Sequence, residues 1–117
     1  MGNYPMLDQI RETQNRLDSL ILKTPSHPWC DPRLGKRIGK ETEVFVKLEL
    51  LQVTGTFKPR GALNVMLHLK PDALERGVTA VSAGNHAIAT AYAAKVFGTT
   101  AKVVMPKNVN TLRMRLA

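Results

Sequence analysis

The chain is poor in cysteine and in aromatic residues. Its 117 residues include a single cysteine, Cys30, and aromatic side chains make up 5% of the total. One cysteine cannot form an internal disulfide or supply paired thiolate ligands to a metal, so we expect no disulfide-stapled fold, no metal centre and a reducing, cytoplasmic location. The shortage of aromatic rings argues against a surface that stacks on nucleic-acid bases.

Long apolar runs are also missing. No stretch approaches the roughly 18 to 20 consecutive apolar residues of a membrane helix, and the first residues lack the basic-then-apolar pattern of a signal peptide. No internal repeat or low-complexity segment is found. We therefore expect a soluble protein without a membrane partner.

Acidic residues are scarce relative to basic ones. Seventeen Lys and Arg stand against 9 Asp and Glu, which gives a net charge of +8. Such a charge attracts anions and nucleic acids without specificity. The basic residues are scattered apart from one cluster at Arg33, Lys36, Arg37 and Lys40. Because charged runs usually form solvated faces, nucleic-acid binding is the less favoured interpretation.

Hydrophobic periodicity predicts an α/β fold. Apolar residues repeat at helical spacing near the start, and three prolines break the segment 23–33 into an extended connection. Two short apolar strands flank a helix that ends near Gly98, which predicts a βαβ unit with parallel strands covered on both faces. The predicted elements are helix 5–20, strand 44–50, helices 59–69 and 71–76, strand 78–82, helix 86–97, strand 101–105 and a helix beginning near 109.

Two short polar motifs lie where helices are predicted to begin. The first, Thr54–Ala62, reads TGTFKPRGA and places Lys58 before a proline that suits the first helical turn. Neighbouring Phe57 and Arg60 are expected to lower the pKa of the Lys58 amine and favour its reaction with an aldehyde. The second, Ser82–His86, reads SAGNH and follows a predicted strand, where free helix N–H groups can receive a carboxylate or phosphate.

These motifs together resemble those of a known enzyme family. Lys47-Leu48-Glu49, Gln52, the TGTFKPRGA segment and SAGNH resemble, in order and spacing, the pyridoxal-phosphate enzymes of fold type II, particularly threonine/serine dehydratases. Ile21–Pro25 and Val103–Pro106 are similar to that family too. The resemblance implies a partial three-layer αβα fold with a parallel sheet, similar to the tryptophan synthase β subunit.

The resemblance also implies a role for each motif residue. Lys58 would carry pyridoxal phosphate covalently and, once freed by substrate, remove the α-proton. Phe57 would flank the cofactor, and Asn85 would hydrogen-bond its ring hydroxyl. The substrate carboxylate would be received by the loop residues Ser82, Gly84, Asn85 and His86. The products would be a 2-oxo acid and ammonia, with the cofactor as electron sink.

The resemblance further implies that the chain is the N-terminal portion of a longer enzyme. Residues 1–50 would belong to the large cofactor domain and 51–117 to part of the small domain. The family's glycine-rich phosphate loop and the residue facing the pyridine nitrogen would follow residue 117, so we expect residues 1–117 alone to be inactive. The complete enzyme is expected to be a homo-oligomer, a dimer, acting on a small amino acid.

Several alternatives remain open from the sequence. Serine racemase, threonine synthase and cysteine synthase relatives share the cofactor class. Ala83 favours dehydration, because racemases similar to this family tend to place a proton-donating serine there. A non-catalytic basic module that binds nucleic acid, and an inactive remnant that pairs with a full-length subunit, are the alternatives from other classes.

Overall fold

The structure is a computed structural model that describes residues 4–39 and 41–117. Within these residues the chain forms helices, two short 3-10 turns and two small sheets. In chain order, the elements are α1 (Leu7–Leu17), β1 (Ser26–Pro28), α2 (Pro32–Ile38), β2 (Phe45–Lys47), η1 (Glu49–Leu51), η2 (Val53–Gly55), α3 (Lys58–Leu67), α4 (Pro71–Glu75), β3 (Val78–Val81), α5 (Asn85–Val96), β4 (Ala101–Val104) and α6 (Thr111–Leu116).

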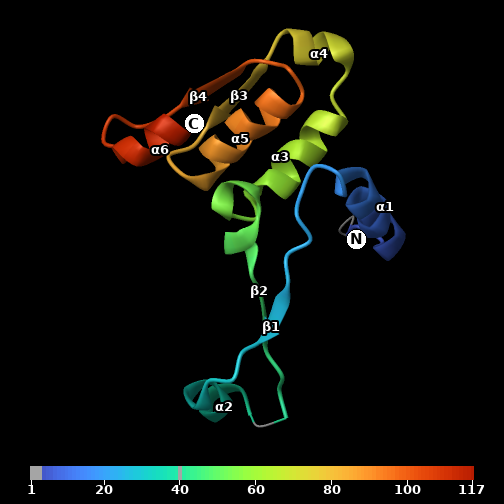
Figure 1. The fold of residues 1–117 in the computed structure, drawn as a ribbon, viewed down its shortest axis with the longest axis vertical. Coiled ribbons are helices and arrows are strands. Elements are labelled where there is room, and N and C mark those ends of the chain that lie inside the picture. The colour runs from blue at the N-terminus through green and yellow to red at the C-terminus, as the bar shows by residue number, and fades with distance from the viewer. Residues whose placement is uncertain (1–3, 40) are drawn as a thin grey trace.

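The elements divide into a packed body and a projecting arm (Figure 1). Helix α5 lies beside the β3–β4 sheet, α3 packs against α5, and α1 lies against α3. Strands β1 and β2 with α2 form the arm, which extends away from the body and contributes to overall dimensions of 53 × 39 × 32 Å. The candidate site belongs to the body.

The body contains the predicted βαβ unit. Strands β3 and β4 pair in parallel, from Val78↔Ala101 to Val81↔Val104, and α5 connects them. The prediction of parallel strands around a helix is confirmed. The expectation that both faces are covered is wrong for the described residues: Val81 and Val104 are 81% and 56% exposed, because α5 packs on one face and no described element covers the other.

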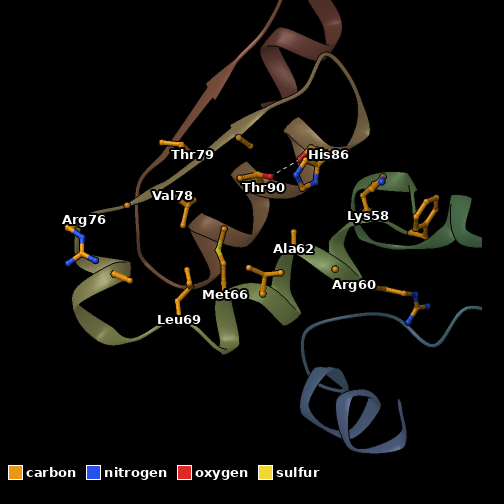
Figure 2. A pocket seen from close by; sticks show the side chains of 16 residues that line it. Lys58, Arg60, Ala62, Met66, Leu69, Arg76, Val78, Thr79, His86 and Thr90 are labelled. Carbon is orange, nitrogen blue, oxygen red and sulfur yellow. Dashed lines mark hydrogen bonds between the residues drawn. The ribbon is translucent and has the colours of Figure 1, made fainter. Parts of the chain in front are cut away.

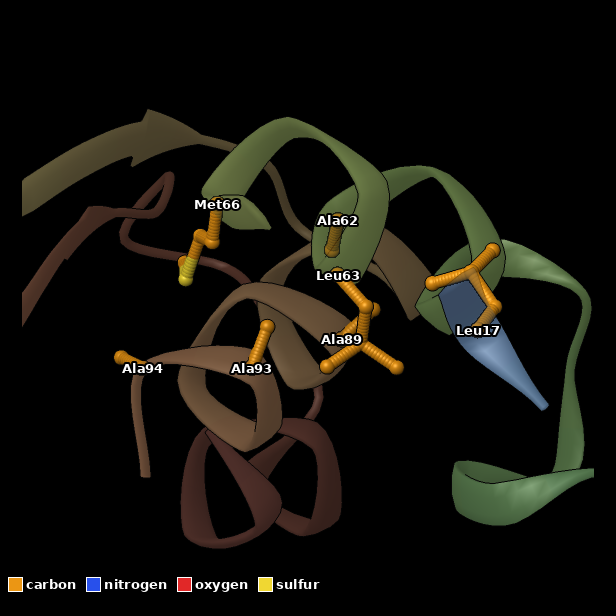
Figure 3. Packing of buried hydrophobic residues seen from close by; sticks show 7 residues of the cluster. All are labelled: Leu17, Ala62, Leu63, Met66, Ala89, Ala93 and Ala94. Atoms are coloured by element: carbon orange, nitrogen blue, oxygen red, sulfur yellow. The ribbon is translucent and has the colours of Figure 1, made fainter. Parts of the chain in front are cut away.

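The hydrophobic core lies between α3 and α5 (Figure 3). Leu63 is fully buried, and small residues such as Ala89 and Ala93 let the two helices approach closely. Leu17 of α1 joins the same cluster. The predicted first helix, 5–20, therefore exists but is shorter, and α3 covers only the end of its apolar face at Leu17, while Leu7 and Ile10 stay exposed.

The arm differs from its prediction. Within the expected extended segment 23–33, β1 pairs antiparallel with β2, and the predicted strand 44–50 is reduced to β2. Pro25 and Pro28 lack the N–H groups that would lengthen the ladder, and Leu48 makes one last backbone bond to the Pro25 carbonyl at 2.9 Å. Helix α2 was not predicted; Asp31 caps it by accepting the Arg33 N–H at 2.8 Å.

The basic cluster predicted from the sequence lies on this arm. Arg33, Lys36 and Arg37 are exposed residues of α2, and Lys40 lies outside the described residues. The Arg33 guanidinium pairs with the Asp31 carboxylate at 2.9 Å. The described part of the cluster is thus a solvated helix surface.

Glycines with positive φ mark two chain reversals in the body. Gly98, with φ of 65°, follows the last residues of α5 and donates its N–H to the Lys95 carbonyl at 3.3 Å, as expected for a helix end. Gly77, with φ of 83°, connects α4 to β3, and a Cβ there would lie 3.0 Å from the Thr100 carbonyl oxygen. Only glycine fits this second position without moving the backbone.

Candidate active site

Lys58 is the first residue of α3 and follows a tight turn. Thr54 and Gly55 adopt positive φ values of 63° and 69° in that turn. The Lys58 N–H donates to the Thr56 hydroxyl at 3.1 Å, and Pro59 at the start of the helix is fully buried. The backbone of Lys58 is thus restrained by the hydrogen bond to Thr56 before it and by the buried Pro59 after it, as expected for a lysine followed by proline at a helix start.

A cavity of about 740 Å³ opens beside Lys58 (Figure 2). Phe57, Lys58 and His86 line one end of it. Toward α4, the lining becomes apolar and includes Met66 and Val78. The cavity therefore combines an amine and an imidazole with a long apolar wall.

The Phe57 ring is the nearest partner of the Lys58 amine among the described contacts. The Lys58 Nζ lies 5.1 Å from the ring centroid. A ring face at this distance attracts the protonated amine and offers a flat apolar surface beside it. Both side chains are exposed, and Phe57 is 59% exposed. A flat aromatic ligand joined to Lys58 can therefore pack against Phe57.

Arg60 has a different role from the one that the sequence suggested. Arg60 is among the residues that line the cavity, but its guanidinium is directed away from it and donates to both carboxylate oxygens of Glu49, at 2.8 and 2.7 Å (Figure 2). The hydrogen bonds from Arg60 lower the pKa of Glu49 from 4.5 to about 2, and Glu49 raises the pKa of Arg60. Because Glu49 compensates its charge, Arg60 is not the free cation that was expected to act on Lys58.

The segment Ser82–His86 leads from β3 into α5: Ser82–Gly84 form the connecting loop, and Asn85 and His86 belong to the helix. Gly84 is the N-cap of α5 and donates its N–H to the Ser82 hydroxyl at 3.2 Å, and Asn85 begins the helix. The first N–H groups of this 12-residue helix lack intrahelical partners and carry the positive end of its dipole. The loop is therefore suited to a carboxylate or phosphate, as predicted.

Of the predicted site residues, the structure brings Phe57, Lys58 and His86 to one cavity. Ser82, Gly84 and Asn85 lie on the segment that ends at His86, but they do not line this cavity. The structure thus joins the two motifs through His86.

Two further residues at the site were not predicted. Thr90 is buried, lines the cavity and donates its hydroxyl to the His86 carbonyl at 2.8 Å. Its position four residues after His86 on a helix was the signal that could have identified it. Arg113 donates to the Ala83 carbonyl at 3.2 Å, and no local pattern indicates this contact, because it depends on the path of the chain between β4 and α6.

The donor set suits an aldehyde cofactor and a substrate that carries an anionic group. Lys58 supplies the amine that an aldehyde binds, Phe57 supplies a flat surface, and the start of α5 can receive a carboxylate. Over residues 4–39 and 41–117, no group of three or more His, Cys, Asp or Glu residues could hold a metal ion, and no helix is long and apolar enough to cross a membrane.

Comparisons with known proteins agree with this chemistry. The family profile described as "Pyridoxal-phosphate dependent enzyme" matches residues 18–117. The chain is 55% identical over 114 residues to a phenylserine dehydratase of Ralstonia pickettii, covering 96% of this chain and 33% of the relative. It is 42% identical over 101 residues to an L-threonine ammonia-lyase of Thermotoga maritima, covering 86% of this chain and 24% of the relative.

A solved structure gives the same result for the fold. The serine racemase of Dictyostelium discoideum is similar with a TM-score of 0.79 and 34% identity, covering 95% of this chain and 35% of that chain. The chain thus spans a third or less of the length of these curated relatives. With the two motifs meeting at one cavity of an α/β fold, the chain belongs to the family of pyridoxal-phosphate dependent enzymes, which use pyridoxal phosphate as their cofactor.

Proposed function

We propose that the protein is an ammonia-lyase that dehydrates a β-hydroxy α-amino acid, L-threonine or L-serine, to a 2-oxo acid and ammonia. The observation that carries this proposal is the meeting of Lys58 and His86 at one cavity, with the start of α5 beside them. The identities to phenylserine dehydratase and L-threonine ammonia-lyase support the reaction class.

Each residue has a role in this proposal. Lys58 holds the cofactor and then, as the free amine, removes the α-proton of the substrate. Phe57 and Asn85 contact the cofactor. The substrate carboxylate is received by Ser82, Gly84, Asn85 and His86, where the helix dipole offsets its charge. When bound, the cofactor supplies the electron sink for loss of the hydroxyl as water.

Ala83 distinguishes this proposal from racemisation. Racemisation needs a proton donor on the face of the α-carbon opposite the base, and the alanine side chain has no proton to give. Serine racemase remains the second candidate, because the Dictyostelium discoideum enzyme shares this fold at 34% identity. For the complete protein, we keep the division into a large-domain part, 1–50, and a small-domain part, 51–117, as a proposal.

The test is to locate the cofactor on the protein. The complete protein is incubated with pyridoxal 5′-phosphate, reduced with borohydride and digested, and the phosphopyridoxyl peptides are identified by mass spectrometry. We expect the label on Lys58 in preference to exposed lysines such as Lys95 and Lys102. A label spread evenly over the lysines, or one that avoids Lys58, contradicts the assignment.

A further inference from the structure

A polar cluster lies on the side of α3 opposite the cavity and joins three chain segments. The Arg60 guanidinium binds Glu49 through two parallel hydrogen bonds. Thr24 donates its hydroxyl to Glu49 at 2.5 Å, and Lys47 donates its ammonium group to the Thr24 carbonyl at 2.6 Å. The Glu49 side chain is 16% exposed and the Arg60 side chain 32% exposed. Two parallel hydrogen bonds between a guanidinium and a carboxylate fix the orientation of both side chains and are stronger than a single hydrogen bond.

Gln52 makes a second connection to the same segment. It is buried, accepts the Leu22 N–H at 2.8 Å and donates to the Leu22 carbonyl at 2.8 Å. Its side-chain oxygen also accepts the Val53 N–H at 2.9 Å. Glu49 and Gln52, which precede Lys58 in the chain, are therefore both hydrogen-bonded to the segment around Leu22 and Thr24.

Arg60 lies two residues after Lys58, so holding Arg60 in place affects the direction of the Lys58 side chain. Two residues along an α-helix turn the side-chain direction by about 200°, so the two side chains leave the first turn of α3 on nearly opposite sides. Figure 2 shows Lys58 beside the cavity and Arg60 directed away from it. The helix has no side-chain cap at Phe57. Anchoring Arg60 therefore sets the rotation of the turn that carries Lys58.

We propose that Glu49 and Arg60 are positioning residues for Lys58: by clamping the first turn of α3 to the Thr24 segment, they aim the Lys58 amine into the cavity. This inference rests on the proposed function of Lys58. The pair acts through geometry, because Glu49 compensates the charge of Arg60.

The experiment measures the share of label on Lys58 as Glu49 is changed. The complete protein and its variants are labelled with pyridoxal 5′-phosphate and borohydride under conditions where circular dichroism shows them folded. In Glu49→Gln, which loses the ionic fork, we expect the share of label on Lys58 to fall to that on Lys95. Glu49→Asp retains the carboxylate and should recover part of the preference, as should Arg60→Lys through its retained charge.

The ion pair between Arg76 and Asp72 supplies the matched control. It also joins an arginine to a carboxylate, at 2.9 Å, lies near the far end of the cavity and is mostly exposed. Asp72→Asn should leave the share of label on Lys58 unchanged. This contrast separates a specific effect of Glu49 from a general loss of one carboxylate.

The outcomes are distinguishable. If the unaltered protein shows no preference for Lys58, the proposed function fails. If the protein prefers Lys58 and Glu49→Gln keeps that preference while it is less stable, the pair is purely structural and the positioning role is refuted. Should Glu49→Gln fail to fold, Glu49→Asp and Arg60→Lys decide, because an undiminished share of label on Lys58 in both overturns the inference.

Discussion

Acid should destabilise this chain through one carboxyl group, Glu49. The usual pKa of a glutamate is 4.5. In the folded chain the pKa of Glu49 is lowered to about 2, because Arg60 and Thr24 hydrogen-bond the ionised form. A folded-state pKa below the unfolded one favours folding at high pH. The contribution is fully present above about pH 4.5 and is lost as the pH falls toward 2.

The magnitude follows from the two pKa values of Glu49. A difference of about 2.5 between them corresponds to about 3 kcal/mol, since each pKa unit is worth about 1.4 kcal/mol. The total stability of a domain of this size is about 5 to 15 kcal/mol. Protonation of Glu49 should therefore remove a large fraction of the free energy of unfolding.

Urea unfolding followed by far-ultraviolet circular dichroism measures this effect. The free energy of unfolding of the unaltered chain and of Glu49→Gln is determined at several values between pH 7 and pH 2.5. Glu49→Gln should be less stable at pH 7, and the loss of stability on acidification should be smaller than in the unaltered chain by about 3 kcal/mol. Asp72→Asn, in a pair whose side chains are 70% and 63% exposed, should change stability by less than about 1 kcal/mol.

An equal loss of stability on acidification in the unaltered chain and in Glu49→Gln would refute this prediction. That result would mean that Glu49 has a similar pKa in the folded and unfolded states, and that the fork to Arg60 does not favour the ionised form. Equal effects of Glu49→Gln and Asp72→Asn at pH 7 would refute it in the same way.

Three further predictions concern the fold and the site. Gly77→Ala should lower the free energy of unfolding, measured in urea, by more than about 2 kcal/mol, because the new Cβ would meet the Thr100 backbone and the residue has a positive φ. Gly35→Ala is the control: no atom lies within 4 Å of its Cβ position, so this change should be neutral or slightly stabilising. Leu63→Ala should cost about 3 kcal/mol by leaving a cavity between α3 and α5, and Val65→Ala, at a residue 61% exposed, should cost less than about 1 kcal/mol in the same assay. In the complete enzyme, Ala83→Ser should raise D-serine formation relative to elimination in chiral chromatography; an unchanged ratio would remove this position as the determinant.

Local patterns were sufficient to predict the body of the fold. The β3–α5–β4 unit is encoded by two short apolar strands and a helix that ends near Gly98, all within neighbouring residues. The start of α3 at Lys58 follows from the turn and Pro59. The structure brings Lys58 and His86 to one cavity, while the roles of the six motif residues stay predictions.

The parts that sequence reasoning missed depend on contacts between distant segments. Pairing of β1 with β2 joins residues about twenty apart, and prolines made that segment look like a plain connection. Glu49 lies 11 residues before Arg60, beyond two 3-10 turns, so no helical spacing indicated that the charge of Arg60 is compensated. Coverage of the sheet was overestimated, because parallel strands usually have helices on both faces and the described residues supply helices for one.

The placement of the core between α3 and α5 has a consequence for how the chain folds. Six of the seven buried residues of the core cluster lie within 62–94, and none belongs to the β1–β2 hairpin. Burial of apolar surface is the main favourable contribution to folding, so the hairpin arm gains little stability of its own. We therefore expect the α3–α5 unit to form the folding nucleus, with the hairpin arm and the Glu49 clamp ordering later, so that the turn carrying Lys58 reaches its final orientation last.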